Sequence, residues 1–160
     1  MSIKTISVAI LAFALVACKP DNTKNYAFKS AGAKDVKVAL RLEVANNHSA
    51  RMKGLSHRHE LPDGTGMLFV FDEPDYYAMW MKDTFIPLDI IFLNNDKVVT
   101  YIAADRPINN LATIAPCHAD GREPDDACIM KNSDIRYVVE IPAGAAAKHG
   151  IIPGDILVGM

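Results

Sequence analysis

A stretch near the middle of the chain, Gly66 to Leu93, constrains the fold more than any other part of the sequence. It holds the only tryptophan, Trp80, and most of the phenylalanines, so it must supply much of the core. Apolar runs of this length, broken by short polar turns, are typical of buried strands. Lys82, Asp83 and Asp89 lie within the stretch, and a buried charge must find a partner or belong to a site. The stretch therefore predicts both a core and a candidate site.

Alternation of apolar and polar residues predicts a mainly β protein. Residues from Val36 to Val44 follow the two-residue period of a half-buried strand. Leu88–Leu93 and Val98–Ala103 flank a short polar turn and predict a hairpin. Further strands are predicted at residues 67–71, 77–82, 135–141 and 156–158.

Two short helices complete the predicted elements. The first is capped by Ser49 and runs to about His57, with Met52 and Leu55 on a buried stripe. The second covers residues 145–149 and stops before a glycine. The predicted fold is mainly β: a compact antiparallel sandwich or barrel-like domain with one or two short helices.

The start of the chain is predicted to be a lipoprotein signal peptide, residues 1–18. A lysine precedes an apolar run that is too short to span a bilayer as a helix. The run ends in Leu15-Val16-Ala17-Cys18, which resembles a bacterial lipobox, so Cys18 is the predicted lipid-bearing N-terminus. The alternative is an ordinary secretory signal in which Cys18 is incidental.

The mature chain divides into a predicted flexible tether, residues 19–33, and one β-rich domain, residues 34–160. Lys19 follows the cysteine, and by resemblance to Gram-negative lipoproteins this favours the outer membrane. The predicted location is the periplasmic face of that membrane, held by a lipid anchor. The predicted partners are thus the membrane, through the anchor, and a small molecule or envelope protein of unknown identity.

The remaining cysteines, Cys117 and Cys128, form an even pair in an exported domain, which predicts a disulfide. Two buried free thiols are the alternative. The formal charge is −2, and the loss of Lys4 with the signal makes it −3, which argues against nucleic acid. His48, His57 and His59 do not have the spacing of known metal motifs. No metal and no cofactor is predicted.

Several motifs in one order carry a resemblance to a known family. They are Arg51-Met-Lys-Gly54-Leu55, Gly66-Met-Leu-Phe-Val-Phe71, Trp80-Met-Lys82, Ile86-Pro-Leu-Asp89, Val139-Glu-Ile-Pro-Ala-Gly144 and Gly150-Ile-Ile-Pro-Gly154-Asp155. Together they resemble the domain-of-unknown-function family 192, also called uncharacterised protein family 0127. The resemblance implies a small β-rich domain and no established activity. The chain has Asp83 where the family pattern has asparagine.

Trp80, Lys82, Asp83 and Asp89 are the strongest candidate site residues. On a strand, Trp80 and Lys82 share one face and can line a pocket, while Lys82 can bind an anion or pair with Asp89. The alternative is a structural ion pair beside a core tryptophan. Arg51 and Arg58 are a second candidate, a clamp for carboxylate or phosphate, against a solvated helix face or a brace to the turn at Asp72.

Three functions remain open on the sequence. The favoured one is a lipid-anchored periplasmic or envelope binding module with a small pocket around Trp80. The second is a hydrolase-type enzyme that uses Lys82, Asp83 and Asp89. The third is a structural domain for protein interaction.

Overall fold

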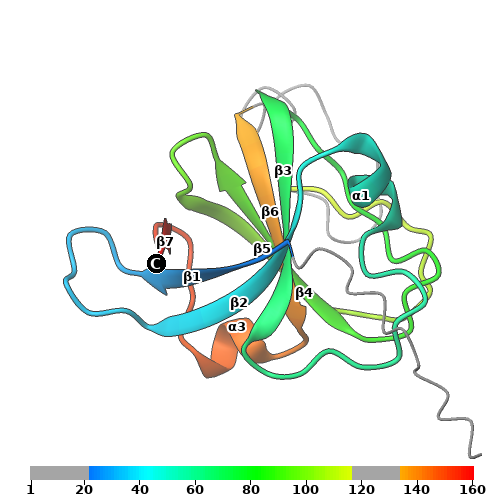
Figure 1. Cartoon of the computed structure of the whole chain (residues 1–160), viewed down its shortest axis with the longest axis horizontal. Helices are drawn as coiled ribbons and strands as arrows, with labels where there is room; N and C mark the ends of the chain where they lie inside the picture. The colour runs from blue at the N-terminus through cyan, green and yellow to red at the C-terminus, as the bar shows by residue number, and fades with distance from the viewer. Residues whose placement is uncertain (1–21, 117–133) are drawn as a thin grey trace, which may run out of the picture.

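The computed structural model describes residues 22–116 and 134–160 (Figure 1). Its strands form one sheet of seven in the order β5-β4-β6-β3-β2-β1-β7. The strands are β1 (Thr23–Lys29), β2 (Val38–Ala45), β3 (Thr65–Asp75), β4 (Leu88–Asn94), β5 (Val99–Arg106), β6 (Ile135–Pro142) and β7 (Ile156–Gly159). The short helices are α1 (His48–Lys53) and α3 (Ala145–Lys148). The prediction of a mainly β domain with short helices is confirmed.

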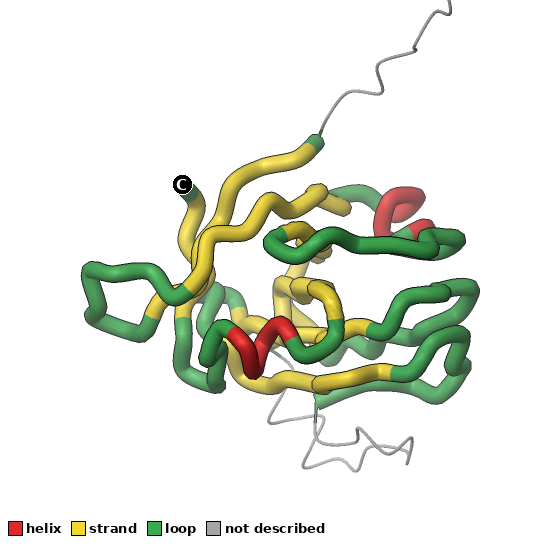
Figure 2. The backbone as a smooth tube through the Cα atoms, turned by 90° about the horizontal axis from the view of Figure 1, so that it is seen from below, coloured by secondary structure: helices red, strands yellow, loops and turns green. Residues whose placement is uncertain are grey.

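The sheet curls until its two edge strands approach each other, as the view in Figure 2 shows. Val98, at the start of β5, forms a bridge with Ile156 of β7. The N–H of Leu157 donates to the carbonyl of Lys97 at 3.0 Å across the same junction. The result is a half-barrel, as the barrel-like alternative predicted.

One strand pair departs from the predicted antiparallel arrangement. β2 and β3 are parallel, with Arg41 opposite Thr65 and Ala45 opposite Phe69. A parallel pair needs a long crossover, and here the crossover carries α1 and the loop that follows it. Because α1 lies on this crossover, it packs beside β3 and outside the barrel (Figure 1).

Alternation along the strands divides the core into an inner and an outer cluster. The inner cluster fills the barrel and includes Phe28, Leu42, Leu68, Ile91, Val139, Ile141 and Leu157. The outer cluster lies on the other face of β3, β6 and β4 and includes Leu55, Phe69, Met81, Leu88, Ile90, Phe92 and Val138. Both faces of the central strands are thus buried, which explains why the sequence of β4 is almost continuously apolar.

The predicted tether over residues 19–33 is corrected by β1. Thr23–Lys29 pair with β2 on one side and with β7 on the other. Ala27 and Phe28 are fully buried, and Phe28 belongs to the inner cluster. The segment looks like a polar linker because only two of its side chains enter the core. Its hydrogen bonds come from β2, the next strand along the chain, and from β7, which begins more than a hundred residues later.

The first helix is shorter than predicted. The side chain of Asn47, not Ser49, accepts a hydrogen bond from the N–H of Ala50 and caps α1. The helix ends at Lys53, and the next residue, Gly54, has a φ of 48°. Leu55 is buried just beyond the helix, but Met52 is 54% exposed, so the predicted buried stripe does not form.

Candidate functional site

A groove with a volume of about 380 Å³ lies between α1, β3 and the segment that follows β3. Its lining is mainly aromatic and thioether: Met52, Phe69, Phe71, Tyr77, Met79 and Trp80, with His48, Arg51, Asp72 and Ala78 also present. We call it the Trp80 groove. Trp80 is 51% exposed, so the only tryptophan is not a core residue. A half-exposed indole beside an apolar hollow is an arrangement suited to ligand contact.

The segment that carries Trp80 is held by scattered hydrogen bonds and not by a strand. Among the described residues, Met79 alone in this segment forms a bridge, to Ile114, with N–H to carbonyl distances of 2.8 and 2.9 Å. The N–H of Met81 donates to the carbonyl of Asn110, and Met81 is fully buried. The predicted strand over 77–82 is therefore wrong. Trp80 and Lys82 nevertheless line one shared hollow, together with Met52 and Asp83.

Asp83 shapes the end of this segment through its backbone. It has a φ of 54°, in the left-handed region that aspartate and asparagine tolerate better than most residues. Its carbonyl accepts from the N–H of His57 at 2.7 Å, and its N–H donates to the side chain of Asn109 at 3.2 Å. This backbone role suits aspartate and asparagine alike, which explains how Asp83 can replace the asparagine of the family pattern.

Arg51 forms one wall of the groove and is already engaged. Its guanidinium donates to the carbonyl of Val70 at 2.8 Å and to the carboxylate of Asp72 at 3.1 Å. It also lies 5.5 Å from the ring centre of Phe71, which in turn stacks on Tyr77. The residue braces the end of β3 against α1, and its charge is balanced by Asp72.

Arg58 does not join Arg51 in a clamp. The helix ends before Arg58, and its guanidinium forms two hydrogen bonds with the carboxylate of Glu43, at 2.6 and 2.7 Å. The hydrogen bond with Glu43 raises the pKa of Arg58 above its usual value. The predicted two-arginine anion site is not assembled.

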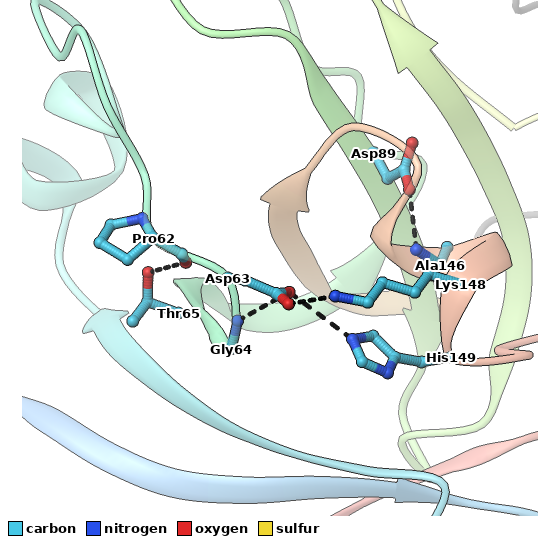
Figure 3. A network of polar contacts seen from close by, with 8 residues as sticks. All are labelled: Pro62, Asp63, Gly64, Thr65, Asp89, Ala146, Lys148 and His149. Carbon is cyan, nitrogen blue, oxygen red and sulfur yellow. Dashed lines mark hydrogen bonds and ion pairs between the residues drawn. The ribbon is translucent and has the colours of Figure 1, made fainter.

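Asp89 is fully buried, but it lies away from the Trp80 groove and does not pair with Lys82. One carboxylate oxygen accepts from the N–H of Asp105 at 2.8 Å, and the other accepts from the N–H of Ala146 at 2.9 Å. The second bond satisfies an amide in the first turn of α3 (Figure 3). Asp89 therefore fixes α3 to β4 and is a structural residue.

A surface ion pair reinforces the same region of the molecule. Asp63, in the turn before β3, contacts the amino group of Lys148 and lies 3.6 Å from Nε2 of His149 (Figure 3). The hydrogen bond with Lys148 lowers the pKa of the Asp63 carboxyl. This network joins the turn to the C-terminal end of α3, and its groups are largely engaged with one another.

Glu140 is the residue that sequence reasoning missed. It lies on β6, opposite Met67 of β3 and Ile90 of β4, and its neighbours place its side chain on the outer face of the sheet. Only 4% of the residue is exposed. Burial raises the pKa of its carboxyl from 4.5 to about 8, although the charge of Arg58 opposes this shift. No hydrogen bond from any described residue reaches the carboxyl group, which is unusual for a buried acid.

The carboxyl of Glu140 belongs to a small cavity that adjoins the Trp80 groove. The cavity has a volume of about 30 Å³ and shares five lining residues with the groove, Arg51, Met52, Phe69, Met79 and Trp80. Its remaining wall includes Ser56, Lys82, Thr84 and Glu140. The hydroxyls of Ser56 and Thr84 point to the carbonyl of Lys82, at 3.4 and 3.3 Å. Polar and charged groups therefore gather in the small cavity beside the apolar groove.

A sequence signal for Glu140 was present. It stands in the apolar run Val138-Val139-Glu140-Ile141, just as Asp89 stands in its own. The same region explains why residue 66, at the start of the central stretch, is a glycine. A Cβ on Gly66 would lie 2.2 Å from the backbone oxygen of Glu140. The glycine lets β3 approach β6 closely.

Other predicted residues lie outside the described residues, namely Cys18, Cys117 and Cys128. The lipid attachment and the disulfide stay predictions. Within residues 22–116 and 134–160, no group of three or more His, Cys, Asp or Glu side chains could hold a metal ion. A search of those same residues finds no helix with the length and hydropathy needed to cross a membrane.

Comparison with known proteins defines the class of this chain. Residues 29–159 match the model of DUF192, described as "Uncharacterized ACR", and the chain belongs to this family. No curated protein matches the chain.

Two solved structures are similar over most of the chain. The first is a protein of Sinorhizobium meliloti 1021, provisionally described as a transcription regulator. It is 31% identical, with a TM-score of 0.70, over 86% of this chain and 93% of that one. The second is a protein of unknown function from Novosphingobium aromaticivorans DSM 12444. It is 29% identical, with a TM-score of 0.71, over 97% and 99% of the two chains.

Proposed function

We propose that this protein is a lipid-anchored binding module of the bacterial envelope, which holds a small and mainly apolar molecule in the Trp80 groove. The observation that carries the proposal is the groove itself, an aromatic hollow of about 380 Å³ beside a half-exposed Trp80. Pockets of this size and lining are typical of small-molecule sites. The charges at its wall cancel in the Arg51–Asp72 pair, so the groove selects for shape and apolar surface.

The anchor would place the groove close to the membrane surface. Four residues, 19–22, separate Cys18 from β1. They span at most about 17 Å between the two ends when fully extended. With β1 in the sheet, the domain is tied much closer to the lipid than a tether of fifteen residues would allow. Palmitate should label the wild type and not Cys18→Ser, and equal labelling would remove the anchor from the proposal.

The binding function is tested with Ala78→Phe, which fills the groove at an exposed position and keeps Trp80 as the only tryptophan. Mature wild type and variant are purified in parallel from membranes, and their bound small molecules are compared by mass spectrometry. A molecule enriched with the wild type should change the emission of Trp80 when it is added back. No enriched molecule, and no response of Trp80 to an envelope extract, would refute the binding function.

The two alternatives have less support. The hydrolase reading requires Asp89, whose carboxylate oxygens are occupied by the amides of Asp105 and Ala146. An interaction domain would be favoured if a protein, and no small molecule, is enriched with wild type over Ala78→Phe. We do not extend transcription regulation to this chain, because its formal charge of −2 does not favour nucleic acid.

A further inference from the structure

Glu140 has the features of a binding group and lacks those of a structural acid. Structural acids in this molecule are saturated with partners: Asp155, 2% exposed, contacts Lys37, Ser30 and the N–H of Ile152. Glu140 is as deeply buried and receives no hydrogen bond from the described residues. Among the described residues, the fully buried side-chain atoms without a hydrogen-bond partner are Arg136 Nε and His149 Nε2, and the Glu140 oxygens are not among them. The carboxyl oxygens therefore keep a little accessible surface, as a group that meets a bound molecule would.

The surroundings of Glu140 indicate where a hydrogen-bond partner for its carboxyl group could bind. The cavity that Glu140 lines adjoins the Trp80 groove, and the two share the lining residues Met52, Met79 and Trp80. A molecule whose apolar body fills the groove would bring a narrow polar end towards the carboxyl. The cavity of about 30 Å³ admits a group no larger than about one water molecule.

We propose that Glu140 is the polar binding group of the Trp80 groove, and that it takes the acceptor oxygen of an uncharged, mainly apolar molecule. This inference rests on the proposed binding function and names the chemical class of its ligand. The ligand oxygen would belong to a carbonyl, an amide or a hydroxyl.

The charges around the carboxyl favour an uncharged ligand over an amine. Lys53 and Lys82 line the same cavity, and the charge of Arg58 also acts on Glu140. These cations would repel an ammonium group at the narrow end. With a pKa of about 8, the acid carries its proton at neutral pH and can donate it in a hydrogen bond.

A small diazo compound tests this arrangement without the natural ligand. Diazomethane is uncharged and reacts with protonated carboxyl groups. The carboxyl proton moves to the carbon of the reagent, and the carboxylate oxygen then bonds to that carbon as dinitrogen leaves, which gives a methyl ester. The native mature protein is treated at about pH 7, where a group with a pKa of about 8 keeps its proton, and peptides are mapped by mass spectrometry.

The expected result is modification of Glu140, absent in Glu140→Gln and slower by about tenfold or more in Ala78→Phe, where the filled groove must open first. Asp89, equally buried but bonded to two amides, should stay unmodified and is the internal control. Circular dichroism and urea unfolding confirm that both variants are folded. Modification of Glu140 only in urea, or at equal rates in wild type and Ala78→Phe, would overturn the inference.

The result is separable from that of the binding test. If a co-purified molecule changes Trp80 emission while native Glu140 stays unmodified, the groove binds a ligand and Glu140 does not contact it. If Glu140 is modified through the groove and no molecule is found, the binding function fails and the accessibility of the acid stands.

Discussion

Two buried acids on neighbouring strands of this protein have opposite environments. Asp89 on β4 and Glu140 on β6 are one position out of register, with Asp89 opposite Ile141 and Ile90 opposite Glu140. They therefore face opposite sides of the sheet. Asp89 points to the inner side and holds two backbone amides, whereas Glu140 points to the outer side and holds none.

The comparison teaches that burial does not separate a structural acid from a functional one. Asp89 is 0% exposed and Glu140 is 4% exposed, a difference too small to decide anything. The two acids differ in the number of hydrogen-bond donors that reach their carboxyl groups. A buried carboxylate is stable when amides offer it hydrogen bonds, and a carboxyl without them keeps its proton. A buried carboxyl group without hydrogen-bond donors lowers the stability of the folded protein. This loss of stability marks Glu140 as the candidate site residue.

The largest effect is expected from Asp89→Ala. The substitution leaves the amides of Asp105 and Ala146 without their acceptor inside the protein, and α3 loses its attachment to β4. Two charge-assisted hydrogen bonds of this kind predict a loss of about 4 kcal/mol in the free energy of unfolding. Urea unfolding at pH 7 measures it. A loss below about 1 kcal/mol would show that Asp89 is not the structural member of the pair.

Glu140 is expected to make stability fall as the pH rises. Its pKa is raised from 4.5 to about 8, so the folded protein keeps a proton that the unfolded chain releases. The contribution is therefore complete below about pH 4.5, falls between there and about pH 8, and is lost above that range. Between pH 5 and 7 the loss should be about 2.5 kcal/mol.

Glu140→Gln isolates this effect, because glutamine is an uncharged group of the same size. Its unfolding free energy should lack this fall between pH 5 and 7, and the variant should be more stable than wild type at pH 7. Parallel pH profiles for wild type and Glu140→Gln would place the Glu140 pKa near its ordinary value and end the contrast with Asp89.

Arg58→Met should sharpen the same comparison with a smaller change in stability. Arg58 is the cation that lowers the pKa of Glu140 against the effect of burial. Without Arg58 the pKa of Glu140 in the folded protein should rise further, so the fall in stability should extend to a higher pH. Its ion pair with Glu43 is partly exposed, so the loss at pH 7 should be at most about 1 kcal/mol. An unchanged pH profile would mean that Arg58 does not act on the acid.

The smallest effect is expected from Lys82→Ala. Lys82 is exposed and is one of the residues that line the Glu140 cavity, and no described residue forms an ion pair with it. The unfolding free energy should change by no more than about 0.5 kcal/mol. A loss of several kcal/mol would restore the structural interpretation of Lys82 that the sequence left open.

Much of the fold could be predicted from local pattern. The hairpin of β4 and β5 and the strand β6 follow from apolar runs and turn residues that act over a few positions. β1 could not be predicted in the same way, because its edges are satisfied by β2 and by β7, which begins more than a hundred residues later. The segment 77–82 misled for the opposite reason: its alternation is that of a strand, but among the described residues only its Met79 forms a β-bridge.

The sequence by itself determined that Asp89 and Glu140 would be buried, because each stands in a run of large apolar residues that folding removes from water. It also placed Trp80 and Lys82 near each other, since they are two positions apart. Only the tertiary structure decided what each acid meets. The side of the sheet follows from strand register, and the hydrogen-bond donors of Asp89 come from α3 and from the end of β5. Register and donors are long-range properties, so two acids that look alike in the sequence came to have different roles.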